Sequence, residues 1–118
     1  MNTNSIGKKG EKKACTYLKR HGYEIIACNF SCRFGEIDVI AQNKEYICFV
    51  EVKTRNRKTI ALPREFVNNK KQERLIKTAQ MFLAKYNTEK QPRFDVIEIS
   101  ETGLFGKKTV HIENAFDV

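Results

Sequence analysis

The sequence has no apolar run long enough to cross a membrane, and Met1 to Lys13 lacks the apolar core of a secretory signal. It also has no internal repeat, no low-complexity segment and no linker that would divide it. Its two histidines, His21 and His111, lie far apart and do not form the closely spaced pair of a zinc finger. These absences argue against a membrane-spanning or secreted protein. We expect one soluble, cytoplasmic domain over residues 1–118.

Cysteine is also scarce, with four residues at positions 15, 28, 32 and 48. Cys28 and Cys32 have a C-x3-C spacing, but no second pair follows, so the spacing gives little support for zinc. Cys15 and Cys48 lie among apolar residues and are predicted to be buried thiols. Without a secretory signal, we expect the cysteines to be reduced.

Acidic residues are fewer than basic ones. Lysine and arginine total 22, aspartate and glutamate total 14, and the net charge is +8. The hydrophobic fraction of 41%, with 8 Phe and 4 Tyr, is typical of a folded chain. A basic excess favours polyanionic partners, either nucleic acid or an anionic membrane surface. Many small soluble proteins are basic, so charge alone does not decide between these.

Apolar periodicity and turn residues predict the order αβββαββ. A first helix capped by Asn4 or Ser5 ends near Arg20, before Gly22. A second helix begins at Pro63, ends near Tyr86 and carries the apolar stripe Val67, Leu75, Ile76, Ala79, Phe82 and Leu83. The predicted strands are 23–30, 35–41, 46–53, 93–99 and 109–112. The fold class is mixed α/β, with helices packed on a central sheet.

Two acidic residues and a lysine fall on one predicted β-hairpin. Side chains alternate along a strand, so Glu51 and Lys53 share a face. A two-residue loop at 43–44 would pair Asp38 with Phe49, on that same face. A slip of one residue would move Asp38 to the opposite face, so the prediction depends on register.

Two nearby carboxylates repel each other and favour a hard cation between them, and Mg²⁺ prefers oxygen ligands. Metal-assisted attack of water on a phosphodiester is one reaction that such a site supports, and a nearby lysine can orient or deprotonate the water. The alternative is a salt bridge between Glu51 and Lys53 with no catalytic role, because the pattern D…E-x-K is short and common.

Each predicted helix directs one charged side chain toward the sheet. Glu11 falls on the helix face that also carries Ala14 and Leu18, and Lys71 lies four residues before Leu75. Inward charges are costly unless they are paired or bound to a metal, so both indicate a shared polar site. The alternative is that both side chains reach solvent at the edge of the stripe.

These residues resemble the uncharacterised YraN-type bacterial proteins of the PD-(D/E)xK nuclease superfamily, which are similar to archaeal Holliday-junction resolvases. The resemblance covers essentially the whole chain. It rests on Gly10-Glu11 with Ala14 and Leu18, Gly22-Tyr23, Asn29, Arg33, Gly35 to Asp38, Phe49 to Arg55, Lys71, Arg93 to Val96, and Asn114 to Phe116.

The resemblance implies a restriction-endonuclease-like core, a mixed central sheet flanked by helices. It implies that Asp38, Glu51 and the Val52 carbonyl hold Mg²⁺ or Mn²⁺, that Lys53 is the catalytic lysine, and that Glu11 and Lys71 are further catalytic residues. It implies a DNA endonuclease, with branched or junction DNA as one substrate, and a homodimer by analogy with resolvases. The roles of Asn29, Arg93 and Asp95 stay open, with an Arg93–Asp95 ion pair as one interpretation.

Basic residues flank these positions in the sequence and suit sequence-independent phosphate contacts. The predicted nucleic-acid-binding residues are Arg33, Arg55, Arg57, Lys58, Lys70 and Arg74. The alternative is a solvated basic surface. Two other functions stay open: a non-catalytic nucleic-acid-binding module in DNA metabolism, and an RNA-processing nuclease.

Overall fold

The structure is a computed structural model, and it describes residues 3–55, 68–101 and 107–116. Its elements follow the predicted order αβββαββ. They are α1 (Thr3–Arg20), β1 (Glu24–Cys32), β2 (Gly35–Gln42), β3 (Tyr46–Arg55), α2 (Asn69–Leu83), β4 (Gln91–Glu101) and β5 (Lys107–Ile112). The predicted mixed α/β class is confirmed.

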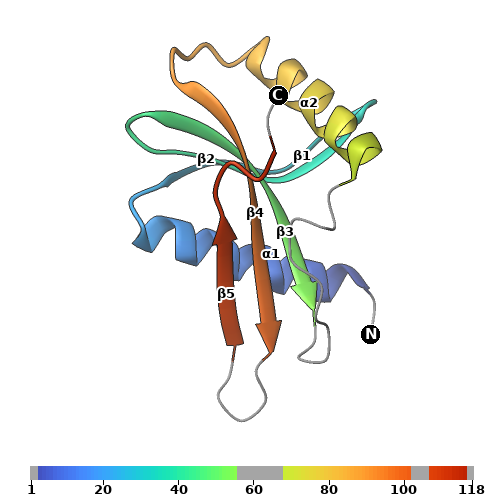
Figure 1. Cartoon of the computed structure of the whole chain (residues 1–118), viewed down its shortest axis with the longest axis vertical. Helices are drawn as coiled ribbons and strands as arrows, with labels where there is room; N and C mark the ends of the chain where they lie inside the picture. The colour runs from blue at the N-terminus through green and yellow to red at the C-terminus, as the bar shows by residue number, and fades with distance from the viewer. Residues whose placement is uncertain (1–2, 56–67, 102–106, 117–118) are drawn as a thin grey trace.

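One five-stranded mixed sheet forms the centre of the molecule, with spatial order β1-β2-β3-β4-β5. β3 and β4 are parallel, and every other neighbouring pair is antiparallel. A parallel pair needs a crossover connection, and α2 lies in the connection between β3 and β4. Figure 1 shows α1 crossing one face of the twisted sheet and α2 lying over the other, near β1 and β2. This arrangement is compatible with a restriction-endonuclease-like core.

Each face of the sheet has its own apolar core, because strand side chains alternate between the faces. On one face, Ala14 and Leu18 of α1 pack against Val39, Cys48 and Val50. On the other face, buried residues of α2 pack against β2, β3 and β4; this second core contains Ile40, Phe49, Leu75, Ala79 and Phe94. In the described part of the chain, neither helix has the length and apolar character that a membrane span needs.

The second helix begins later than predicted. Asn68 has an extended backbone (φ −81°, ψ 174°), and its side chain accepts a hydrogen bond from the Lys71 N–H at 2.9 Å. It is therefore the N-cap, and α2 begins at Asn69 and not at Pro63, since asparagine is a favoured capping residue. Pro63 and Val67, which the prediction placed in the helix, lie outside the described residues.

The cysteines do not pair as the C-x3-C spacing would require. The Cys28 sulfur lies 3.8 Å from that of Cys15 on α1, whereas Cys32 lies 3.8 Å from the Thr78 hydroxyl on α2. The two thiols of the motif therefore contact different helices. Cys48 is buried as predicted, but Cys15 is only half-buried.

Candidate metal and nucleic-acid site

The turn between β2 and β3 decides which face Asp38 occupies. The Asn43 side chain accepts hydrogen bonds from the Glu45 and Tyr46 N–H groups at 2.9 and 2.8 Å, which places the two-residue loop at 44–45 and not at 43–44. The ladder is therefore displaced by two residues from the predicted one and pairs Val39 with Val50. A shift of two preserves side-chain alternation, so Asp38 and Glu51 still face the same side.

Asp38 is half-buried and lies just beyond the end of this ladder, opposite a change in the β1 backbone. Asn29, which lies opposite Asp38, has a left-handed backbone (φ 55°), a conformation that asparagine adopts more readily than most residues. As a result Cys28 contacts α1, while Phe30, two residues later, packs on Phe82 of α2. Asn29 therefore has a structural role at this change.

The Asp38 carboxylate takes the place of a backbone acceptor where the ladder between β2 and β3 ends. Its Oδ2 accepts a hydrogen bond from the Val52 N–H at 2.8 Å, just past the last Val39–Val50 pair of the ladder. The N–H and C=O of one strand residue point to the same edge. The Val52 carbonyl therefore points toward β2, where the strands have separated.

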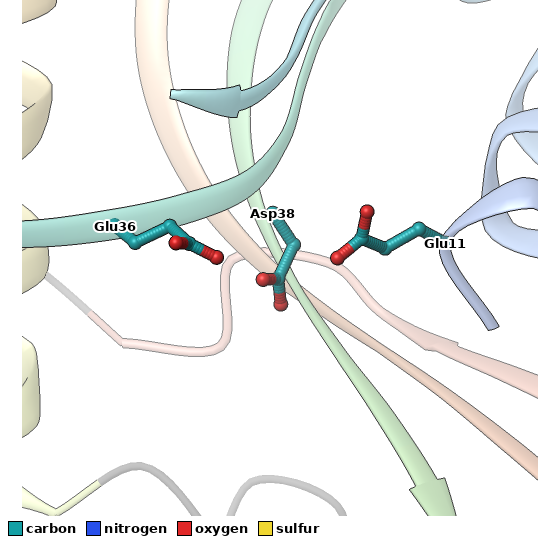
Figure 2. Close-up of side chains that lie close together, drawn as sticks. All are labelled: Glu11, Glu36 and Asp38. Carbon is teal, nitrogen blue, oxygen red and sulfur yellow. The ribbon is translucent and has the colours of Figure 1, made fainter. Parts of the chain in front are cut away.

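Helix α1 approaches the sheet closely enough to bring Glu11 to Asp38. Gly10 is buried, and a Cβ at that position would collide with the Thr54 hydroxyl on β3. The next residue, Glu11, extends toward Asp38 in Figure 2, and Glu36 of β2 reaches Asp38 from the opposite side. Carboxylate oxygens of Glu11, Glu36 and Asp38 all lie within 4.8 Å of one another.

Glu36 is a site residue that the sequence analysis did not select. The available signal was its position two residues before Asp38, which places both on one strand face. The predicted register instead placed Glu36 opposite Glu51 on the strand that follows. Glu36 is exposed and Asp38 is half-buried, so the cluster opens to solvent on the Glu36 side.

The electrostatics of the site reflect an excess of buried negative charge. Burial and the neighbouring carboxyl of Glu51 raise the pKa of Asp38 to about 8. Burial alone would raise the pKa of Glu51 as well, but the Asp38 proton and the Lys71 ammonium hold it below its usual value. The two shifts have opposite directions because two adjacent buried carboxylates cannot both ionise cheaply.

Lys71 of α2 partly compensates this charge. Its Nζ lies 2.6 Å from Glu51 Oε2, and this ion pair raises the Lys71 pKa despite partial burial. The buried Oε2 of Glu51 is therefore partnered by the Lys71 ammonium. Burial and the positive charge of Lys71 lower the pKa of Lys53, the other lysine at the site.

A cleft of about 510 Å³ lies over the carboxylates on the α2 side of the sheet. Asp38, Glu36 and Glu51 line it together with Lys70, Lys71 and Arg74. Lys70, Arg74 and Lys77 follow one another at four- and three-residue spacing and therefore share one face of α2. Arg33 lies 4.8 Å and Lys77 5.7 Å from the Phe34 ring, which connects the β1–β2 turn to this basic helix face.

The family model of the uncharacterised protein family UPF0102 matches residues 10–99, which include every carboxylate and lysine of this site. The chain belongs to UPF0102. This family is the one to which the YraN-type proteins belong, so the resemblance noted in the sequence is confirmed at the level of the family.

Curated UPF0102 proteins match over nearly their full length. One from Caldanaerobacter subterraneus is 45% identical, covering 98% of this chain and 98% of the relative. One from Persephonella marina is 44% identical over 95% of this chain and 93% of the relative. One from Geobacter metallireducens is 43% identical over 100% of this chain and 97% of the relative. UPF0102 proteins from several bacteria therefore share the length of this chain.

Not all predicted residues of this UPF0102 protein fall within the described structure. Asp38, Glu51, Lys71 and Glu11 converge on one site, with Lys53 within electrostatic range of Glu51 and Asp38. Lys70 and Arg74 line the same cleft. Arg57 and Lys58, and the side chain of Arg55, lie outside the described residues.

Arg93 and Asp95 form a separate cluster on the α1 face of the sheet, where Asp95 pairs with Val50 of β3, the residue before Glu51. Arg93 donates to Asp95 through Nε and a terminal nitrogen at 2.9 and 2.8 Å. The His111 Nε2 donates to Asp95 at 2.8 Å and the Asn114 backbone N–H at 3.0 Å. Asp95 is 1% exposed, so this is the structural ion pair that the sequence left open.

Proposed function

We propose that this protein is a metal-dependent endonuclease that hydrolyses phosphodiester bonds in DNA, with branched or junction DNA as a candidate substrate. One observation carries the proposal. Glu11, Glu36, Asp38 and Glu51 come from three different elements and converge beside Lys53 and Lys71, in a cleft with a basic rim. A purely structural cluster has no need for four carboxylates with only two lysines.

The donor set fits a hard divalent cation. Mg²⁺ and Mn²⁺ take carboxylate, carbonyl and water oxygens, and the site offers Asp38, Glu51 and the Val52 carbonyl, with Glu11 and Glu36 within reach. Burial and the Glu51 carboxyl raise the pKa of Asp38, and a bound cation would favour the ionised carboxylate instead. When bound, the cation supplies activation of water and stabilisation of charge on the phosphate oxygens.

The protein's own residues would perform the other steps. Lys53, whose pKa is lowered by burial and by Lys71, is suited to orient the attacking water and to exchange a proton with it. Lys71 holds Glu51 ionised and adds positive charge beside the phosphate position. Glu11 and Glu36, which approach Asp38 from opposite sides, would help to hold the cation and orient water.

DNA is the proposed partner because the acidic site alone would repel a phosphodiester. Lys70, Arg74, Lys77 and Arg33 provide positive charge around the cleft for phosphate contacts that do not read sequence. We further propose a cytoplasmic protein that acts as a homodimer, since cleavage of two strands takes two sites. Hydrodynamic mass in solution tests the dimer.

The decisive experiment is cleavage of linear, nicked and four-way DNA in Mg²⁺ by wild type, Asp38→Ala and Lys53→Ala. We expect Mg²⁺-dependent products from wild type and a loss of about 10²–10⁴-fold in Lys53→Ala, the usual contribution of proton-transfer catalysis. Equal salt-sensitive binding by all three without cleavage would favour a non-catalytic nucleic-acid-binding module. Cleavage of RNA in parallel reactions, and not of DNA, would favour an RNA-processing nuclease.

A further inference from the structure

A second basic surface lies on α1, on the opposite face of the sheet from the α2 cleft. Lys9, Lys12, Thr16 and Arg20 follow at spacings of three and four residues, so they form one stripe along the helix. The stripe borders a groove of about 500 Å³ between α1 and strands β4 and β5. α1 has no acidic residue in its first turn, and its last turn contains basic residues. The stripe therefore carries a strong local positive charge.

The same groove contains an ordered aromatic pair. The rings of Tyr17 and His21 stack with centroids 4.1 Å apart, and the His21 Nδ1 donates to the Tyr17 carbonyl at 2.8 Å. The Tyr17 hydroxyl interacts with His111 at 3.3 Å, so its ring is held from both ends. His21 is exposed, and Tyr17 covers one face of its ring.

The stripe leads directly away from the carboxylate site. Glu11 belongs to the site, and the next residue, Lys12, lines the groove. With a rise of about 1.5 Å per residue, the helix extends roughly 13 Å from Glu11 to Arg20. In Figure 1, α1 passes behind β3, β4 and β5.

We infer that the α1 groove binds a single-stranded segment of nucleic acid that leaves the carboxylate site, with phosphates on Lys9, Lys12 and Arg20 and a base against His21. This inference rests on the proposed function for its choice of nucleic acid as the partner. Proteins that bind single strands without sequence preference combine two features. Basic side chains follow the phosphate backbone of the nucleic acid, and aromatic rings stack on its bases. A duplex would keep its bases paired and would not use the ring.

The test is fluorescence anisotropy of a labelled 20-nucleotide oligothymidylate in EDTA, so that binding is measured without chemistry. The groove variant is Lys12→Ala with Arg20→Ala. Its matched control is Lys19→Ala with Lys85→Ala, which removes the same charge from exposed positions outside the groove, one on α1 and one just after α2. All four side chains are exposed, and thermal melting checks that both variants fold.

We expect the groove variant to reduce the slope of log affinity against log salt by about 1.4, since each single-strand phosphate contact contributes about 0.7. His21→Ala should weaken oligothymidylate binding about tenfold and leave binding to a 20-base-pair duplex unchanged. Equal effects of the groove variant and its control would overturn the inference. So would binding to phosphatidylserine vesicles that depends on these residues while oligothymidylate binding does not.

The outcome is separable from that of the proposed function. If wild type cleaves DNA and the groove variant binds like its control, only the groove inference fails. If oligothymidylate binding depends on the groove and no variant cleaves any substrate, only the endonuclease proposal fails.

Discussion

Asp38 and Asp95 are two acidic side chains in one sheet with opposite surroundings. Asp95 receives Arg93, His111 and a backbone N–H, and these hold its pKa below the usual value although burial alone would raise it. Asp38 receives one backbone N–H and faces other carboxylates, so its pKa rises to about 8. The chain neutralises one aspartate itself and leaves the other short of positive charge. That difference separates a structural acid from one suited to an external cation.

The largest effect should come from breaking the satisfied cluster. Asp95→Ala leaves the Arg93 guanidinium, 8% exposed, without its main partner. We expect a loss of about 3–5 kcal/mol in the free energy of unfolding, measured by urea denaturation. Asp38→Ala is the comparison, and it should cost far less, because burial and the Glu51 carboxyl already disfavour the charged form of Asp38. Equal losses in both variants would contradict the difference between the clusters.

The two aspartates should also respond oppositely to pH. The folded-state pKa of Asp38, about 8, lies above its ordinary value of 3.8, so folding takes up a proton. Its contribution to stability is complete below about pH 4 and is lost as pH rises through 8. For Asp95 the lowered pKa means that stability is lost as pH falls below its ordinary value.

Urea denaturation of the cation-free protein from pH 5 to 8 measures the Asp38 contribution. Wild type should lose stability across this window, and Asp38→Asn should flatten the profile because the amide does not titrate. The amide oxygen can still accept the Val52 N–H, so the variant changes charge with little change in shape. An unchanged profile in Asp38→Asn would show that another group titrates there.

Cation binding should sharpen the same contrast. At 100 times its Kd, Mg²⁺ should raise the free energy of unfolding of wild type by about 2.7 kcal/mol, measured by thermal or urea denaturation at pH 8. Asp38→Asn should remove this stabilisation. Glu45→Gln, an exposed acid in the β2–β3 turn, should keep it and serves as the charge-matched control. Stabilisation that survives in Asp38→Asn would place the cation elsewhere.

The smallest effect concerns the residue at the edge of the site. Glu36→Gln should weaken Mn²⁺ binding about tenfold, or about 1.4 kcal/mol, because Glu36 is exposed and Asp38 stays in place. Titration calorimetry with Mn²⁺ measures it without any cleavage reaction. Glu45→Gln is again the control, and equal affinities in the two variants would exclude Glu36 from the site.

Much of the fold could be predicted because it follows from local patterns. Alternation predicted β2 and β3 closely, and Gly22, with φ 87°, ends α1 as expected. The α2 start was wrong by six residues, since the Asn68 cap overrode the preference of Pro63 for a first helical turn. The hairpin register was wrong by two residues, since the Asn43 side chain selects the loop.

By itself the sequence determined the element order, the two-sided core and the shared face of Asp38 and Glu51, because side-chain alternation survives even a two-residue shift. Only the tertiary structure decided which carboxylates meet. Glu11 joins Asp38 because Gly10 lets α1 approach β3, and Glu36 joins because the strands bend at Asn29. Likewise His111 contacts Asp95, although the two residues are distant in sequence. Such contacts depend on how elements pack, and no local pattern encodes that packing.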